Sequence, residues 1–96
     1  MAVFVAFGKI TDQGMTKLQG FEGRHREAVK RAETRGAKVL ASYALMGPYD
    51  FLVVLDCPDA ETALRVLTKE AEGGNIRYEA FAAVPIEEFA KITEAA

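Results

Sequence analysis

The chain has 96 residues, of which 50% are hydrophobic and 27% are charged, and its formal net charge is −2. A chain of this length forms a single domain, here residues 1–96, and this composition is that of a globular protein rather than a disordered one. A charge so close to neutral gives no bulk attraction to nucleic acid or to a membrane surface, so we expect neither as a partner.

Cysteine usage and the length of the apolar runs indicate where the protein works. The single cysteine, Cys57, cannot form an internal disulfide, and no Cys and His residues have the spacing of a zinc site. The apolar start of the chain is read as a strand rather than a signal peptide, and no run approaches the roughly 20 residues of a transmembrane helix. We therefore expect a reduced, cytoplasmic protein that holds no metal and no cofactor.

The first half of the chain reads as a strand followed by a helix. Alternating apolar side chains predict a strand over residues 2–9, and residues 11–14 form a polar turn. Residues 15–22 are ambiguous, and a helix is predicted from about residue 22 to residue 35. Its apolar arc consists of Phe21, His25, Ala28, Val29, Ala32 and Gly36, with Gly36 suited to end the helix.

Two apolar runs, residues 38–46 and residues 50–56, then predict a β-hairpin. Between them, Gly47 supplies backbone freedom and Pro48 fixes φ, so the chain reverses at this point.

A second helix and a fourth strand follow the hairpin. Asp59 is suited to cap a helix that ends near residue 72, and residues 76–84 form the last strand. Pro85 then begins a terminal helix. The expected buried stripe of the second helix consists of Ala60, Ala63, Leu64, Leu67 and Ala71.

The predicted order is βαββαβ with a C-terminal helix, which is the α+β, ferredoxin-like arrangement of a four-stranded antiparallel sheet with two helices on one face. The open face of such a sheet normally alternates with polar residues, yet the run Phe51–Leu55 is apolar on both faces. An uncovered apolar face would be a liability in a monomer. We therefore predict a homodimer in which two sheets pack face to face with twofold symmetry.

Five short motifs resemble the GYD-domain family over roughly residues 3–92. They are the run 11–14 after the first strand, Gly47-Pro48-Tyr49-Asp50 at the hairpin, the run 57–60 after the third strand, the run 74–77 before the fourth strand, and the ending 81–89. The resemblance implies a single GYD-like domain of the dimeric α/β-barrel group. It implies no established chemistry.

Polar residues at two turns are candidates for ligand binding. Tyr49 and Asp50 at the hairpin tip could bind or protonate a ligand, or Asp50 could cap turn amides while the Tyr49 ring packs. Asp12 and Gln13 could close over a ligand, or could serve their own turn. For both pairs we favour the structural role.

His25 is the only histidine, and it lies on the apolar arc of the first helix. Some dimeric α/β barrels that the chain resembles are haem-degrading or quinone-forming monooxygenases or small isomerases, in which a histidine could act as a base or a haem ligand. No second histidine or acidic triad partner is visible, so we favour a partly buried histidine without a catalytic role.

Three functions remain open from the sequence. The leading hypothesis is a small-ligand-binding or regulatory homo-oligomer, with a pocket lined by Phe7, Tyr43 and Val53. The alternatives are a cofactor-independent monooxygenase- or isomerase-like enzyme, and an assembly module without a ligand. The expected partners are a second copy of the chain and a small molecule. The candidate ligand-binding residues are Asp12, Gln13, His25, Tyr43, Tyr49 and Asp50.

Overall fold

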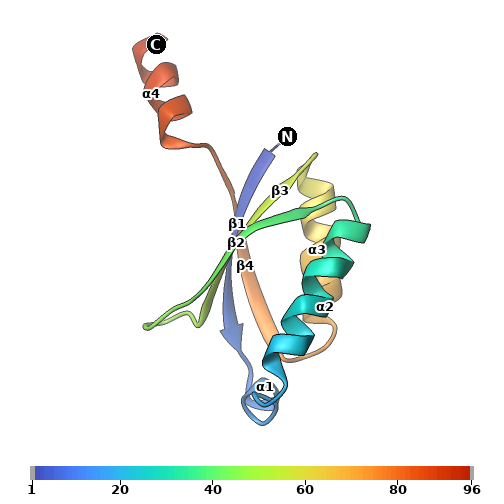
Figure 1. The fold of residues 1–96 in the computed structure, drawn as a ribbon. Helices are drawn as coiled ribbons and strands as arrows, with labels where there is room; N and C mark the ends of the chain where they lie inside the picture. Colours follow the sequence, from blue (N-terminus) through green and yellow to red (C-terminus); the bar gives the residue numbers. More distant parts are fainter. Residues whose placement is uncertain (1, 96) are drawn as a thin grey trace.

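A computed structural model describes residues 2–95 of the protein. It has the predicted α+β, ferredoxin-like fold, a four-stranded antiparallel sheet in the order β2-β3-β1-β4 with helices between the strands and one at the end (Figure 1). The elements are β1 (Ala2–Ile10), α1 (Asp12–Met15), α2 (Phe21–Thr34), β2 (Lys38–Ala44), β3 (Phe51–Cys57), α3 (Ala60–Ala71), β4 (Ile76–Ala83) and α4 (Ile86–Ala95).

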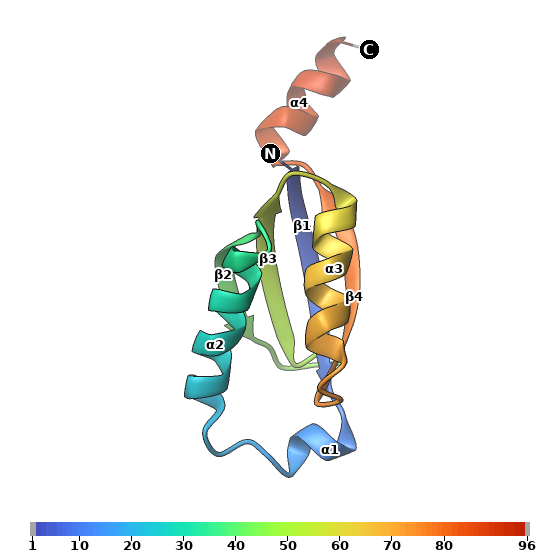
Figure 2. The ribbon, with the colours of Figure 1, turned by 90° about the vertical axis from the view of Figure 1, so that its right-hand side faces the viewer.

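The two long helices, α2 and α3, lie side by side on one face of the sheet, and α4 projects beyond the end of the sheet (Figure 2). The core forms between this face and the helices because apolar side chains from both layers meet there. No helix within residues 2–95 has both the length and the apolar character that a membrane crossing requires. The buried core residues are Phe4, Ala6, Ala32, Ala37, Leu55, Cys57, Ala63, Val66 and Leu67.

The predicted polar turn after β1 is the short helix α1. The Thr11 hydroxyl accepts a hydrogen bond from the Gly14 amide at 3.0 Å, which caps this single turn. The same hydroxyl donates to the Gly74 carbonyl at 2.6 Å. Thr11 thus joins the end of β1 to the loop before β4.

The predicted buried stripe of α3 was confirmed for Ala63 and Leu67 and was wrong for its other members. Ala63, Val66 and Leu67 are buried, whereas Leu64 is 59% exposed. Ala60 and Ala71, also expected to be buried, are exposed. Both sets have helical spacing, so the sequence period alone does not decide which side of the helix meets the sheet.

Regular alternation along residues 38–46 predicts that Val39, Ala41, Tyr43 and Leu45 share one face of the sheet, which was wrong because β2 contains a bulge. Its register with β3 shifts between Val39 and Ala41, and beyond that shift Ser42 lies opposite Val53 while Tyr43 lies opposite Leu52. A bulge inserts one residue and so reverses the face that later side chains occupy. Val39 and Tyr43, expected to share a face, therefore point to opposite sides of the sheet.

The face of the sheet away from α2 and α3, called here the open face, is apolar. Val5, Phe7 and Val54 on the two central strands alternate with core residues and are only half-buried, and Phe81 on β4 is exposed. Near one end of the sheet, Asp56 has a buried carboxylate oxygen with no hydrogen-bond partner within residues 2–95.

Gly14 occupies a position where no side chain fits. A Cβ added there would lie 2.3 Å from the carbonyl oxygen of Asn75, which belongs to the backbone of the neighbouring loop. We expect Gly14→Ala to lower the free energy of unfolding by about 1–3 kcal/mol, the usual cost of overpacking, as measured by urea denaturation.

Gly23 in α2 provides the matched control. A Cβ at this position meets nothing within 4 Å, and Ala is the better helix former, so Gly23→Ala should raise stability by about 0.5–1 kcal/mol. Equal effects of the two substitutions would contradict the close approach of Gly14 to the loop.

Candidate functional site

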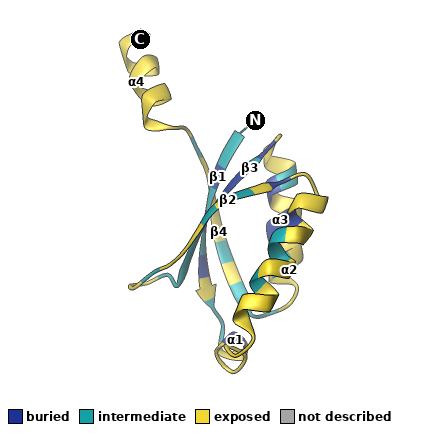
Figure 3. Ribbon diagram, viewed as in Figure 1, coloured by how far each residue is buried: buried dark blue, intermediate teal, exposed yellow. Residues whose placement is uncertain are grey.

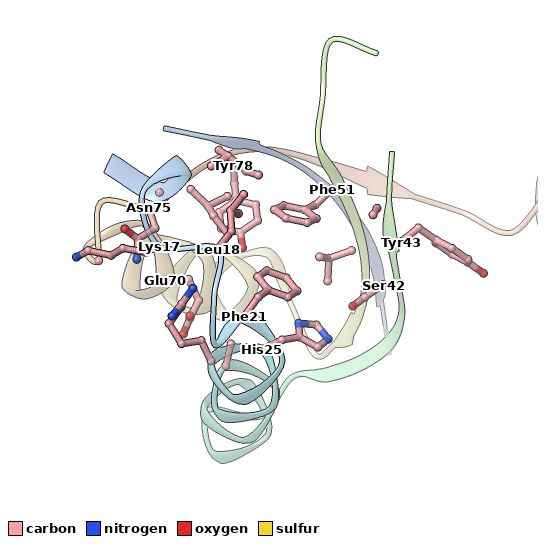
Figure 4. A pocket seen from close by; sticks show the side chains of 18 of the residues that line it. Lys17, Leu18, Phe21, His25, Ser42, Tyr43, Phe51, Glu70, Asn75 and Tyr78 are labelled. Carbon is pink, nitrogen blue, oxygen red and sulfur yellow. The ribbon is translucent and has the colours of Figure 1, made fainter. Parts of the chain in front are cut away.

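A cavity of about 410 Å³ lies between the N-terminal half of α2 and the helix-covered face of the sheet (Figure 4). Its walls come from α2, from β2 and β3, and from the start of β4, with the segment before α2 at the rim. The apolar walls include Leu18, Phe21, Ala28, Phe51, Val53 and Ile76, and the polar walls include Lys17, Arg24, His25, Ser42, Asn75 and Tyr78. This size and this mixture of side chains are typical of small-molecule sites.

Three rings form a stack along one wall of the cavity. The ring of Phe51 lies 5.4 Å from that of Phe21, with an angle of 14° between the planes. The ring of Phe21 in turn lies 5.8 Å from the imidazole of His25, at 9°. Phe21 and His25 are one turn apart on α2, which places both rings on the same side of the helix. This wall is therefore aromatic, with successive rings nearly parallel to one another.

Polar side chains meet near this stack. Figure 4 shows the His25 imidazole and the Ser42 hydroxyl on the same side of the cavity. Tyr78 comes from β4, and burial, followed by the nearby charge of Glu70, raises its pKa to about 12. Tyr78 therefore remains a neutral hydroxyl, able to donate and to accept a hydrogen bond, over the whole physiological pH range.

An ion pair joins the two helices at the cavity wall. Nε of Arg31 on α2 donates to Oε2 of Glu70 on α3 at 2.9 Å, and its Nη2 donates to Oε1 at 2.8 Å. The hydrogen bond to Glu70 is the main reason why the pKa of Arg31 is raised above its ordinary value. Both oxygens of Glu70 are thus occupied, and the pair fixes the distance between α2 and α3.

Asp50 stands outside the cavity and supports the backbone. Its carboxylate accepts a hydrogen bond from the Ile10 amide at 2.8 Å, and its own amide donates to the Gly8 carbonyl at 2.9 Å. These two bonds connect the hairpin tip to the end of β1, so the observed contacts of Asp50 are those of a structural residue.

Tyr49 lies on the open face. Its ring is 5.0 Å from that of Phe7, and its hydroxyl donates to the Glu79 carboxylate at 2.6 Å. That hydrogen bond is the main cause of the raised pKa of Tyr49. Phe7, expected in the pocket wall, is therefore on the other side of the sheet from the cavity.

The remaining candidates from the sequence divide between the cavity and its surroundings. Gln13 does not line the cavity and donates to the Gly73 carbonyl and to the Asn75 side chain at 3.0 and 3.1 Å, and Asp12 is exposed in the first turn of α1. Tyr43 borders the cavity, but Figure 4 shows its ring pointing away. His25 is the candidate whose side chain lies within the cavity wall.

Several residues of the cavity wall were not singled out from the sequence. Phe21 lies on the apolar arc of the predicted helix, and Tyr78 lies on the apolar side of the alternating fourth strand. The sequence pattern therefore predicts that both are buried, but it does not predict that they bind a ligand. Ser42 and the segment at Lys17 carried no such signal, because the β2 bulge and the path of the loop place them there.

Metal binding and thiol chemistry have no support in the described part of the chain. No group of three or more His, Cys, Asp or Glu side chains between residues 2 and 95 is arranged to hold a metal ion. Cys57 is buried, and burial raises the pKa of its thiol, with smaller contributions from Asp59 and Asp56. A thiol in such surroundings is a poor nucleophile.

Comparisons with known proteins give one family. The family model described as "GYD domain" matches residues 4–93. A Thermus thermophilus protein named "Glutamine synthetase and cystathionine beta-lyase binding protein" is 32% identical over 87 residues, covering 90% of this chain and 92% of that protein.

Two solved structures share the fold. The crystal structure of FFRP-DM1 matches with a TM-score of 0.56 and 15% identity, covering 88% of this chain and all of the other. The crystal structure of TTHA0845, also from Thermus thermophilus, matches with a TM-score of 0.55 and 17% identity, covering 88% and 95% of the two chains.

The pKa of Tyr78 leads to a prediction about stability at high pH. Because its folded-state pKa of about 12 exceeds the ordinary value of 10.0, Tyr78 contributes stability that is complete below pH 10 and is lost as the pH rises through 12. This pKa difference corresponds to about 2–3 kcal/mol at most. We expect Tyr78→Phe to remove this part of the alkaline loss of stability, as measured by denaturation at several pH values.

Absorbance of the phenolate ions supplies an independent measurement. The tyrosine titration step at the highest pH should be absent from Tyr78→Phe, and its persistence in that variant would contradict the burial of the Tyr78 hydroxyl.

Proposed function

The chain belongs to the GYD domain family, and on that premise we propose that it is a regulatory homo-oligomer that binds a small molecule in the cavity beneath α2. The cavity is the observation that carries this proposal, because a packed ferredoxin-like domain has no structural need for a hollow of about 410 Å³. We place this function in the cytoplasm, in line with the single buried thiol.

Self-association follows from the open face. Its central strands present apolar side chains such as Val5 and Val54, which are only half-buried, and its outer strands add the exposed rings of Tyr43 and Phe81. A contiguous apolar surface of this kind marks an interface. A second copy supplies an equally apolar sheet, and a twofold axis allows each copy to cover the other.

The terminal helix supports the same conclusion. Ile86, Phe89 and Ile92 are all more than half exposed, and no residue of α4 is buried (Figure 3). A helix of 10 residues gains most of its stability from packing rather than from its own hydrogen bonds. We propose that α4 packs against the second copy.

Binding of other proteins is the regulatory part of the proposal. The Thermus thermophilus relative is named for binding glutamine synthetase and cystathionine beta-lyase. By analogy, we propose that this chain also binds enzymes of its cell and that occupation of the cavity changes that binding. The matched length of the two proteins supports the analogy.

Catalysis of the isomerase or monooxygenase kind is the alternative, and the position of His25 in the cavity wall beside Ser42 is the observation that favours it. An imidazole at such a site could move a proton to or from a bound molecule. The two functions differ in outcome: a regulatory ligand is released unchanged, and a substrate is released as product.

Blocking the cavity tests the small-molecule function. We expect a fragment library to shift the amide resonances of Phe21, Ser42 and Tyr78 in the nuclear magnetic resonance spectrum of the wild-type protein. Ala28→Phe, which places a ring in the cavity, should abolish these shifts. Ala60→Phe, on the exposed start of α3, is the control and should leave them intact. Fragments that bind elsewhere, or none at all, would contradict the proposal.

A charge on the open face tests self-association. We expect Phe81→Arg to convert the homo-oligomer to monomers in sedimentation velocity, because a buried unpaired charge costs several kcal/mol. Leu64→Arg, an equally exposed position on the outer side of α3, should leave the oligomer unchanged. A wild-type protein that sediments as a monomer at micromolar concentration would refute the interface.

A further inference from the structure

We propose that the cavity beneath α2 selects a planar, apolar molecule that carries one negative charge, such as an aromatic carboxylate. This inference rests on the proposed function of small-molecule binding and adds the chemical class of the ligand. Two independent features of the wall carry it: the shape of its apolar part and the sign of its uncompensated charge.

The apolar wall fits a flat body. The rings of Phe51, Phe21 and His25 lie nearly parallel at the cavity wall, with interplanar angles of 14° and 9° between successive rings, so a planar ring that enters the cavity can align with this stack. Aromatic rings favour offset-stacked partners, which gain energy beyond the buried area. Val53 and Ile76 line the cavity as well and are apolar.

The charge of the wall is positive. Its one carboxylate, Glu70, is bound through both oxygens to Arg31, so this pair contributes no net charge. Lys17 and Arg24 also line the cavity, and neither forms a salt bridge within residues 2–95. Figure 4 shows the Lys17 ammonium pointing away from the cavity, so the uncompensated charge of the wall is that of Arg24. The guanidinium of Arg24 donates to the Gln19 carbonyl at 3.0 Å, which leaves its other N–H groups for a ligand.

The start of α2 adds to this positive potential. Gly20 is the N-cap of this 14-residue helix and provides no side-chain cap, and Phe21 and Arg24 of the first turn both line the cavity. The amino end of a helix attracts anions. The acidic residue of that turn, Glu22, lies on the outer surface and pairs with Arg26 at 3.1 Å.

The neutral donors and the cavity volume complete the match. Ser42 and Tyr78 offer hydroxyl groups that can donate to a carboxylate, and a bicyclic acid fits within about 410 Å³. A cationic ligand would meet no unpaired carboxylate in the wall. A nucleotide would need more cations than Arg24 alone provides for its phosphates.

Three probes of the same shape and different charge test the inference. We expect calorimetric titration to show that 2-naphthoate binds about tenfold more tightly than neutral 2-naphthylmethanol, with cationic 2-naphthylmethylamine the weakest. The preference for the acid should decrease as salt is added.

Substitution of Arg24 tests whether the preference for the acid over the neutral probe arises in the cavity. Arg24→Gln, which keeps much of the side-chain stem, should lower the affinity for 2-naphthoate about tenfold and leave that for 2-naphthylmethanol unchanged. Arg26→Gln, on the outer side of the same helix, is the control and should change neither. Equal affinities for the acid and the amine, or equal effects of the two substitutions, would overturn the charge selectivity while leaving small-molecule binding intact. Failure of all three probes to bind, with fragments still binding in the cavity, would overturn the ligand class and leave the proposed function in place.

Discussion

Two helices can cover only one face of a four-stranded sheet, and in this chain both faces of the central strands are apolar. β1 alternates Phe4 and Ala6, which are buried against the helices, with Val5 and Phe7, which lie on the open face. Polar side chains at the alternate positions that face the open side would have made this face stable in water. The chain instead has a surface that a second copy can cover, and this separation of the two faces leaves the helix side free for a site of its own.

The helix-covered face leaves room for a site because α2 is packed unevenly. Ala32, near its C-terminal end, is only 4% exposed, whereas Phe21 at its N-terminal end is 37% exposed. The helix is therefore buried against the sheet near its C-terminal end, and the cavity lies between the helix and the sheet near its N-terminal end. The Arg31–Glu70 pair between α2 and α3 fixes the helices at the boundary between these two regions.

The order of the elements was predictable from the sequence because local signals agreed with one another. Asp59 caps α3 by accepting a hydrogen bond from the Thr62 amide at 2.8 Å, and Gly36 follows α2 with a φ of +92°, as each residue type indicated. The Gly47–Pro48 reversal and the apolar character of both sheet faces were also readable without a structure.

The details of the candidate site were not predictable, because they depend on how the elements pack. One inserted residue in β2 turns Tyr43 away from the helices and brings Ser42 to the cavity side. The side of α3 that meets the sheet was likewise decided by packing, which buried Val66 and exposed Leu64. Asp50 and Tyr49 form a polar pair at a turn in the sequence, yet Asp50 binds the Ile10 backbone amide and Tyr49 binds the Glu79 carboxylate, both outside the cavity.

Native mass spectrometry of freshly purified protein tests the central claim, that the apolar open face is covered by a second copy while the helix side keeps a cavity for a ligand. We predict an even multiple of the 10.5 kDa chain, with a small molecule retained in part of the population and lost on gentle activation before the subunits separate. A mass of one bare chain at micromolar concentration would contradict this claim.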